Sequence, residues 1–344
     1  MNPYALSIML SSLSMGTILV LSSSHWMLTW IGLEMNTLAI IPLMSQQLHP
    51  RSTEATMKYF LTQTMASALI LFSATMNAWS SGQWEIKEML PMQTNMLTIA
   101  LAMKLGMAPV HFWLPEVLQG INLTTGLILS TWQKIAPMTV IYLMYNSLNP
   151  SILTLMGLLS AIIGGWGGLN QTQLRKILAY SSVAHLGWMM TITVLNPKLM
   201  MLNFLVYMIL TSSMFLTMKH LKTTSINMLP LSWSSTPVMM AISMLTLLSL
   251  GGLPPTTGFI PKWLILQELT KQQTITTATV LAMSSLLSLF FYLRLTYTMT
   301  MTNSSNMLIT TSTWRHKSNQ TSTLYSLMTI TSIMLMPLTP GVLL

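Results

Sequence analysis

Apolar runs of about twenty residues follow one another along almost the whole chain, separated by short stretches of turn residues and charges. A helix of about 20 apolar residues is long enough to span the hydrocarbon core of a bilayer. Only 6% of the 344 residues are charged, whereas an ordinary soluble domain has about 25%. These features predict an all-α polytopic membrane protein, with residues 1–344 forming a single membrane domain.

The spacing of the turn signals predicts about eleven transmembrane helices. Their expected ranges are 3–22, 25–45, 56–79, 94–113, 123–146, 151–172, 174–195, 199–219, 237–270, 274–298 and 322–341. So few residues remain between these ranges that no separate globular domain is expected. No basic targeting segment precedes the first run, so we expect insertion during synthesis.

Lysine and arginine residues are divided unequally between the two predicted sides of the membrane. The side that includes the N-terminus has nine of them: Arg51, Lys58, Arg175, Lys176, Lys219, Lys222, Arg294, Arg315 and Lys317. The other side has three: Lys87, Lys198 and Lys271. Because positively charged loops remain inside, the N-terminus is predicted on the matrix or cytoplasmic side. This placement explains most of the net charge of +9, so no nucleic-acid partner is expected.

Three basic residues, Lys104, Lys134 and Lys262, fall inside predicted spans instead. A lysine at the centre of a membrane helix costs about 2.5–3.5 kcal/mol, so such residues usually face a bundle interior or a hydrated cavity. Snorkelling of the side chain to the interface is the alternative, and it suits Lys262 better than the other two. Glu34 is the one carboxylate deep within a span and is the expected counter-ion.

Two histidines, His111 and His185, also fall within predicted spans. Imidazole titrates near neutral pH, so either residue could take part in proton transfer. A buried histidine with a purely structural hydrogen bond is an equally acceptable interpretation.

Two segments share an unusual spacing of glycine and proline. In both "GMAPVHFWLP" and "GLPPTTGFIP" a proline lies three residues after the glycine, and another proline follows six residues later. Pro109 thus matches Pro255, and Pro115 matches Pro261. The segments lie in predicted helices four and nine, which cross the membrane in opposite directions.

This match predicts two inverted five-helix repeats, approximately 1–148 and 149–300, followed by a loop and a last helix in 301–344. Proline breaks the hydrogen bonding of a helix, so helices four and nine are expected to be discontinuous. Matching interruptions in two halves are typical of transport sites, although ordinary proline kinks are the simpler alternative.

Several functional classes are excluded by what the chain lacks. It has no cysteine, which removes disulfides, thiolate metal sites and iron–sulfur ligation. "GGWGGLNQ" does not have the spacing of a dinucleotide fingerprint, and no recurring pair of histidines indicates haem. The 35 methionines and the absence of aspartate indicate a biased, mitochondrial genome.

The segments "PRSTEATMKYFLTQ", "MKLGMAPVHFWLPEV", "GGLNQTQLRKILAYSSVAHLGW" and "LSLGGLPPTTGFIPKW" resemble one known family. It is the mitochondrially encoded subunit 2 family of NADH dehydrogenase, the antiporter-like membrane subunits of respiratory complex I. The resemblance extends over essentially the whole chain. It implies a proton-translocating unit in the mitochondrial inner membrane, coupled to NADH:ubiquinone oxidoreduction elsewhere in the complex.

The resemblance also implies roles for individual residues. Glu34 and Lys104 match the family's glutamate and lysine pair, Lys134 its central lysine, and Lys262 its exit-side lysine. His111 and His185 match positions of the polar axis less closely. Glu34 is expected to control the protonation of Lys104, which passes a proton through water to Lys134.

No cofactor is expected in this chain, because NADH, FMN, the iron–sulfur clusters and ubiquinone belong to other subunits. The expected partners are other membrane-arm and accessory subunits, together with structural lipids. Two alternatives stay open at this point. The subunit could be mainly structural, with a fossil channel, or it could be a free-standing sodium/proton antiporter.

Overall fold

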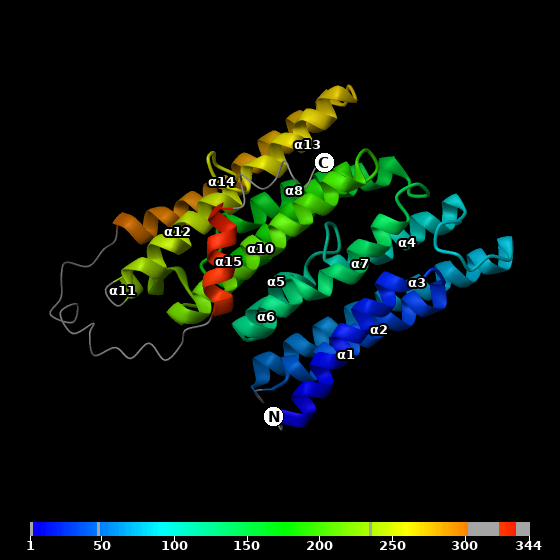
Figure 1. Cartoon of the computed structure of the whole chain (residues 1–344), viewed down its shortest axis with the longest axis horizontal. Helices are drawn as coiled ribbons and strands as arrows, with labels where there is room; N and C mark the ends of the chain where they lie inside the picture. Colours follow the sequence, from blue (N-terminus) through cyan, green and yellow to red (C-terminus); the bar gives the residue numbers. More distant parts are fainter. Residues whose placement is uncertain (1–2, 47–48, 234–235, 302–322, 335–344) are drawn as a thin grey trace. The chain divides into compact units, whose positions relative to one another are not determined.

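Helices form almost every element of the computed structural model, which describes residues 3–46, 49–233, 236–301 and 323–334 (Figure 1). The predicted all-α class is confirmed for these residues. Two basic residues used to predict the orientation, Arg315 and Lys317, and the end of the predicted last helix, 335–341, lie outside this description.

The first of two compact units comprises Met1–Ser160 and Met189–Pro197. Its helices are α1 (Pro3–Ser22), α2 (Trp26–Met44), α3 (Pro50–Ser81), α4 (Pro91–Leu105), α5 (Trp113–Gly120), α6 (Leu123–Ser130), α7 (Trp132–Leu143) and the first part of α8 (Pro150–Gly168). Helices α1, α2 and α3 lie side by side, and α4 and α5 pack against α3 (Figure 1). Because α7 contacts α1, α2 and α4, it occupies the interior of this unit.

The second unit comprises Ala161–Trp188 and Lys198–Leu344. Its helices are the rest of α8, most of α9 (Leu174–Ile192), α10 (Pro197–Leu221), the short η1 (Ile226–Met228), α11 (Leu229–Trp233), α12 (Pro237–Gly251), α13 (Phe259–Lys271), α14 (Ile275–Met301) and α15 (Thr323–Met334). Helix α12 packs against α14 and α15, and α13 packs against α14. The apolar pattern does not predict η1 and α11.

Proline and glycine explain many of the helix boundaries. Helices α1, α3, α4, α8, α10 and α12 all begin at a proline. Proline is favoured there because its missing N–H would have no partner in the first turn anyway. Helices α3, α4 and α12 end at the glycines Gly82, Gly106 and Gly252, each with a positive φ. Glycine adopts this left-handed conformation without a steric penalty.

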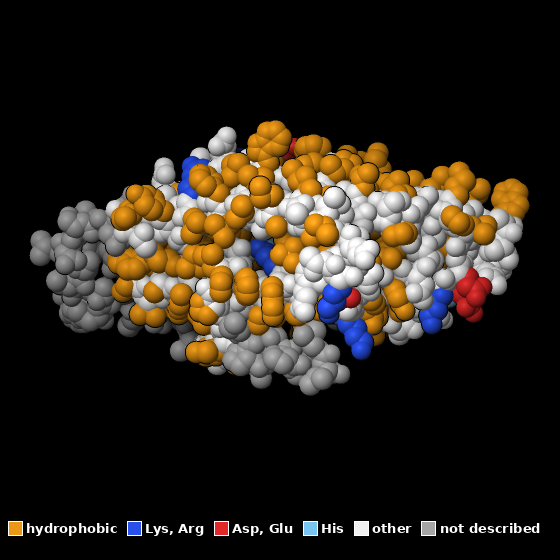
Figure 2. Space-filling model, turned by 90° about the horizontal axis from the view of Figure 1, so that it is seen from above, with side chains coloured by type: hydrophobic (Ala, Val, Ile, Leu, Met, Phe, Trp, Pro, Cys, Tyr) orange, Lys and Arg blue, Asp and Glu red, His pale blue; other side chains and the backbone are white. Residues whose placement is uncertain are grey.

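Six helices among the described residues, α1, α2, α3, α8, α10 and α14, are individually long and apolar enough to cross a membrane. Their outer faces carry large apolar side chains, and Figure 2 shows such side chains spread across the visible face, with charged ones in a few small groups. Trp79 is 87% exposed near the end of α3. In water such a surface would aggregate, so it is suited to contact with lipid.

The predicted interruptions of helices four and nine are both present. Helix α4 ends at Leu105, and the Gly106 N–H donates to the carbonyls of Ala102 and Met103 before the chain resumes as α5. Helix α12 ends in the same way, because the Gly252 N–H donates to the carbonyls of the third and fourth preceding residues, and α13 follows. The peptide bonds before Pro109 and Pro255 are both cis.

A third interruption, which the sequence reading did not include, divides the predicted span 123–146 into α6 and α7. Thr131 lies at the break, where its hydroxyl donates to the Leu127 carbonyl at 2.7 Å. Back-bonding of this kind bends helices. Pro137, inside α7, has no N–H to offer the carbonyl of Gln133. Lys134 therefore lies between two departures from regular helical hydrogen bonding.

A pair of glycine substitutions tests the packing at the first interruption. Gly106 and Gly82 have nearly the same φ, +75° and +73°, so alanine at either position is expected to cost roughly 1–2 kcal/mol. At Gly106 the new Cβ would also lie 2.8 Å from Leu114 Cδ1, which adds about 1–3 kcal/mol of overpacking. The thermal inactivation temperature of the assembled complex should therefore fall further for Gly106→Ala than for Gly82→Ala. Equal losses would show that the contact between Gly106 and α5 is unimportant.

Candidate functional site

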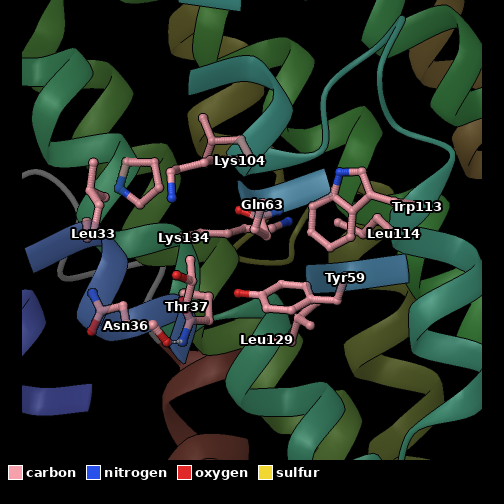
Figure 3. Close-up of a pocket in the computed structure, with 14 residues that line it drawn as sticks. Leu33, Asn36, Thr37, Tyr59, Gln63, Lys104, Trp113, Leu114, Leu129 and Lys134 are labelled. Atoms are coloured by element: carbon pink, nitrogen blue, oxygen red, sulfur yellow. Dashed lines mark hydrogen bonds between the residues drawn. The ribbon is translucent and has the colours of Figure 1, made fainter. Parts of the chain in front are cut away.

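A small cavity in the first unit is surrounded by all the helices from α2 to α7 (Figure 3). Its volume is about 20 Å³, and a cavity of ~10–15 Å³ is large enough to hold a water molecule. The lining residues are Leu33, Asn36, Thr37, Tyr59, Gln63, Lys104, Leu105, Trp113, Leu114, Leu129, Gln133, Lys134, Ala136 and Pro137. Two of the three lysines singled out in the sequence thus share one enclosure.

Lys104 enters this cavity from the last turn of α4. Its side chain is buried, with the residue 7% exposed, and its Nζ has no hydrogen-bond partner among the described residues. The C-terminal end of a helix carries partial negative charge on its free carbonyls, which favours an ammonium group at this position. The interruption after Leu105 therefore gives a charged lysine a favourable field inside the membrane.

Lys134 enters the same cavity from the first turn of α7 and is 2% exposed. Its backbone N–H donates to the Thr131 carbonyl at 3.2 Å, across the break between α6 and α7. This break directs the first turn of α7 into the interior of the unit.

Two amide side chains complete the polar lining of the cavity. Gln133 Nε2 donates to the backbone carbonyl of Asn36 at 3.1 Å, which connects α7 with α2. The side-chain amide of Asn36 and the Nε2 of Gln63 are buried and have no protein partner among the described residues. Buried polar atoms rarely go without hydrogen bonds, so these groups and the Lys104 ammonium are suited to holding water in the cavity.

Trp113 joins the two parts of the interrupted helix beside the cavity. Its Nε1 donates to the Met103 carbonyl at 3.1 Å, which also accepts from the Gly106 N–H at the end of α4. Its ring also meets Tyr59 of α3 edge to face, with 5.7 Å between centroids. The first residue of α5 is thereby held against both α4 and α3.

Glu34 lies on α2, one turn or less from the cavity residues Leu33, Asn36 and Thr37, but it does not line the cavity. Its carboxylate is near enough to Lys104 for a Coulombic interaction. Among the described residues, however, no ion pair joins it to any lysine, and its buried Oε2 has no hydrogen-bond partner. The expected counter-ion is thus present without a direct contact.

Lys262 belongs to the second unit, where it lies in the first turn of α13. Its Nζ donates to the carbonyl of Gly251, the last residue of α12, at 2.9 Å, and lies 5.9 Å from the centre of the Trp188 ring. Lys262 therefore caps the C-terminal end of α12 at the second interruption.

The two histidines lie away from the cavity lining. His111 lies in the segment between α4 and α5, is 2% exposed, and hydrogen-bonds the backbone of Pro109. His185 is buried on α9, with its ring 5.6 Å from that of Tyr207. Within the described part of the chain, no group of three or more histidine or acidic side chains could hold a metal ion.

Glu116 lies in the first turn of α5. It forms a half-exposed ion pair of 2.7 Å with Lys58, which also pairs with Glu54 at 2.6 Å. A carboxylate is favoured at a helix N-terminus, which explains why α5 extends over this residue.

The sequence pattern did not single out Asn36, Gln63, Gln133 or Tyr59, because only lysines, a glutamate and histidines within spans were taken as candidates. A signal was available, since Asn36 is two residues from Glu34 and Gln133 adjoins Lys134. Amides are also costly in hydrocarbon unless they find a partner. Three of these four residues are amides within predicted spans, and this type of side chain is the sequence signal that identifies them.

Two family models together match residues 23–343 of the chain. Residues 23–288 match the family model described as NADH:quinone oxidoreductase/Mrp antiporter, transmembrane, and residues 289–343 match the C-terminus of NADH dehydrogenase subunit 2. NADH-ubiquinone oxidoreductase chain 2 of Xenopus laevis is 58% identical over 341 residues, which cover 99% of each chain. The chain 2 protein of Salmo salar is 59% identical over 343 residues, covering 99% of this chain and 98% of that one.

Solved structures share the fold at lower sequence identity. A chain of respiratory complex I from Thermus thermophilus with bound aureothin superposes with a TM-score of 0.82 at 23% identity, covering 97% of this chain and 80% of that one. A chain of the Mrp complex from Dietzia gives 0.77 at 20% identity, covering 83% and 58%. These structural matches show the shared fold, and the family models and the full-length relatives show that the chain belongs to the NADH-ubiquinone oxidoreductase chain 2 family, the antiporter-like membrane subunits of respiratory complex I.

Proposed function

We propose that this chain translocates protons as an antiporter-like core subunit, using energy from NADH:ubiquinone oxidoreduction elsewhere in the complex. The observation that carries the proposal is the cavity lined by Lys104 and Lys134, which are both buried and share a space large enough for water. Lysine can hold or release a proton, and burial makes the choice sensitive to neighbouring charge. A purely structural core would be expected to be apolar here.

In the proposed relay, Lys104 and Lys134 exchange a proton through water in the cavity. Glu34 would influence the protonation of Lys104 through space, because a carboxylate near a buried lysine changes the balance between its two protonation states. The orphaned amides of Asn36 and Gln63 would orient the water. Lys262 is the proposed exit-side group, and His111 and His185 are further candidates along the polar axis.

The proposal includes the topology predicted from the sequence. Together with α9, α15 and the three interrupted helices α4/α5, α6/α7 and α12/α13, the six long apolar helices make the eleven proposed spans. The shared geometry at Gly106 and Gly252 supports two inverted repeats. The N-terminus would face the matrix, because nine basic residues are predicted on that side of the inner mitochondrial membrane.

The proposed partners are the other subunits of complex I and the surrounding lipid. NADH, FMN, the iron–sulfur clusters and ubiquinone would be bound by those other subunits. A second candidate function is a mainly structural subunit, and one observation favours it. Lys262 donates to the end of α12, which is a sufficient structural reason for its presence.

Substitutions of the two cavity lysines test the relay. Lys104→Met and Lys134→Met keep most of the side-chain volume but cannot carry a proton. We expect each to lower proton pumping in vesicles roughly tenfold, equivalent to ~1.4 kcal/mol in the barrier, with quinone reduction falling in parallel. Glu34→Gln should have a smaller effect in the same direction. NADH-driven acidification and quinone reduction are measured in reconstituted complex.

The matched control is Lys271→Met, because the Lys271 side chain is 62% exposed and lies outside the cavity. It should leave both rates unchanged. Normal quinone reduction and normal proton stoichiometry in an intact Lys104→Met complex would eliminate the relay and favour the structural alternative.

A second pair of variants separates the two roles of Lys262. Lys262→Gln can still donate a hydrogen bond to the Gly251 carbonyl but cannot carry a proton, whereas Lys262→Met can do neither. If Lys262 belongs to the relay, both variants should lose pumping to a similar extent. If Lys262 only caps the end of α12, the Lys262→Gln variant should retain activity and assembly, and only the Lys262→Met variant should reduce them. Pumping rate and the amount of assembled complex are the measurements.

A further inference from the structure

A second, much larger hollow lies on the outside of the second unit, between α12 and α14. Its volume is about 700 Å³, within the ~300–1,000 Å³ range of ligand-binding pockets. Met244 and Leu248 of α12 form one wall. The other wall is formed by residues of α14: Phe290, Leu293, Arg294, Thr296, Tyr297 and Thr300. This groove is distinct from the lysine cavity and takes no part in the proposed relay.

The groove has an apolar end and a polar end. The two helices are antiparallel here, because Ser243 donates to the sulfur of Met299 at 3.8 Å and Gly251 lies beside Tyr292. Leu248, Phe290 and Leu293 therefore lie at one end. Beyond them along α14 come the Arg294 guanidinium and the hydroxyl-bearing side chains of Thr296, Tyr297 and Thr300. The groove thus passes from hydrocarbon side chains to charge and hydroxyl groups within about two helical turns.

Arg294 lies about two turns before the end of α14 at Met301. At 1.5 Å per residue it lies about 29 Å from Ile275, the first residue of the helix, and the hydrocarbon core of a bilayer is about 30 Å thick. A helix that enters the hydrocarbon at its first turn therefore reaches the opposite headgroups at Arg294. A tyrosine one turn further on is typical of the interfacial belt.

Arg294 also retains capacity to bind an anion. One Nη1–H donates to the carbonyl of Leu169 at 2.6 Å, which fixes the guanidinium at the polar end of the groove. Arginine has five N–H donors, and its planar fork matches the oxygens of a phosphate. No ion pair is formed by Arg294 with a carboxylate in the part of the chain that the structure describes.

We propose that this groove binds one anionic phospholipid. An acyl chain lies along Leu248, Phe290 and Leu293, and the phosphate pairs with Arg294. An anionic lipid is favoured over a zwitterionic one because the latter brings its own cation, which a fixed arginine repels. The Leu169 hydrogen bond makes the site part of the packing between α14 and the end of α8, so the lipid also stabilises that contact.

The test uses assembled complex, delipidated and then equilibrated in bilayers of equal parts phosphatidylglycerol and phosphatidylcholine. After exchange into detergent, the phospholipids retained per complex are counted by mass spectrometry. Arg294→Gln removes the charge but can still donate to the Leu169 carbonyl, and Leu248→Trp fills the apolar end. Each variant should lose one phosphatidylglycerol molecule per complex and no phosphatidylcholine.

Two matched controls should keep that phosphatidylglycerol molecule. Arg294→Lys retains the positive charge, and Leu286→Trp alters an α14 side chain that is 58% exposed but outside the groove. Unchanged phosphatidylglycerol in both Arg294→Gln and Leu248→Trp would overturn the proposal. Equal loss of both lipids, or a helix of another subunit occupying the groove in an experimental structure of the complex, would overturn it too.

Discussion

The absence of water from the hydrocarbon core is the constraint on which the rest of this structure depends. Every polar group placed there must find a partner within the protein or in a hydrated cavity, because exposure to lipid costs several kcal/mol. The long helices satisfy their backbone internally. At two of the interruptions a carbonyl at the helix end accepts from a side chain, Met103 from the Trp113 indole and Gly251 from the Lys262 ammonium.

The same constraint connects the helix breaks with the lysines. Ending a helix inside the membrane creates a local site of negative potential. Lys104 occupies the last turn of α4, and Lys262 donates directly to the last carbonyl of α12. Lys134 follows the break at Thr131. An interrupted helix is thus costly to place in a bilayer by itself, but the carbonyls at its end stabilise a positive charge beside it.

Much of the fold could be predicted from local patterns. The apolar runs and the prolines at helix starts predict the bounds of α1 as they are observed. They predict the bounds of α2, α10 and α14 to within a few residues. The glycine and proline spacing predicted the breaks after Leu105 and Gly251, since both depend on local backbone chemistry. The break at Thr131 was missed, because threonine is common in continuous membrane helices and its hydroxyl bends a helix only in some packing environments.

For the candidate site, the sequence by itself determined that Glu34, Lys104, Lys134 and Lys262 needed an explanation, because charges in apolar spans are costly whatever the packing. Only the tertiary structure decided that Lys104 and Lys134 share one cavity, that Glu34 stays beside it without an ion pair, and that Asn36, Gln63 and Gln133 complete the lining. The physical reason is that periodicity indicates which residues a helix buries, whereas the neighbours they meet depend on how six separate helices pack around them.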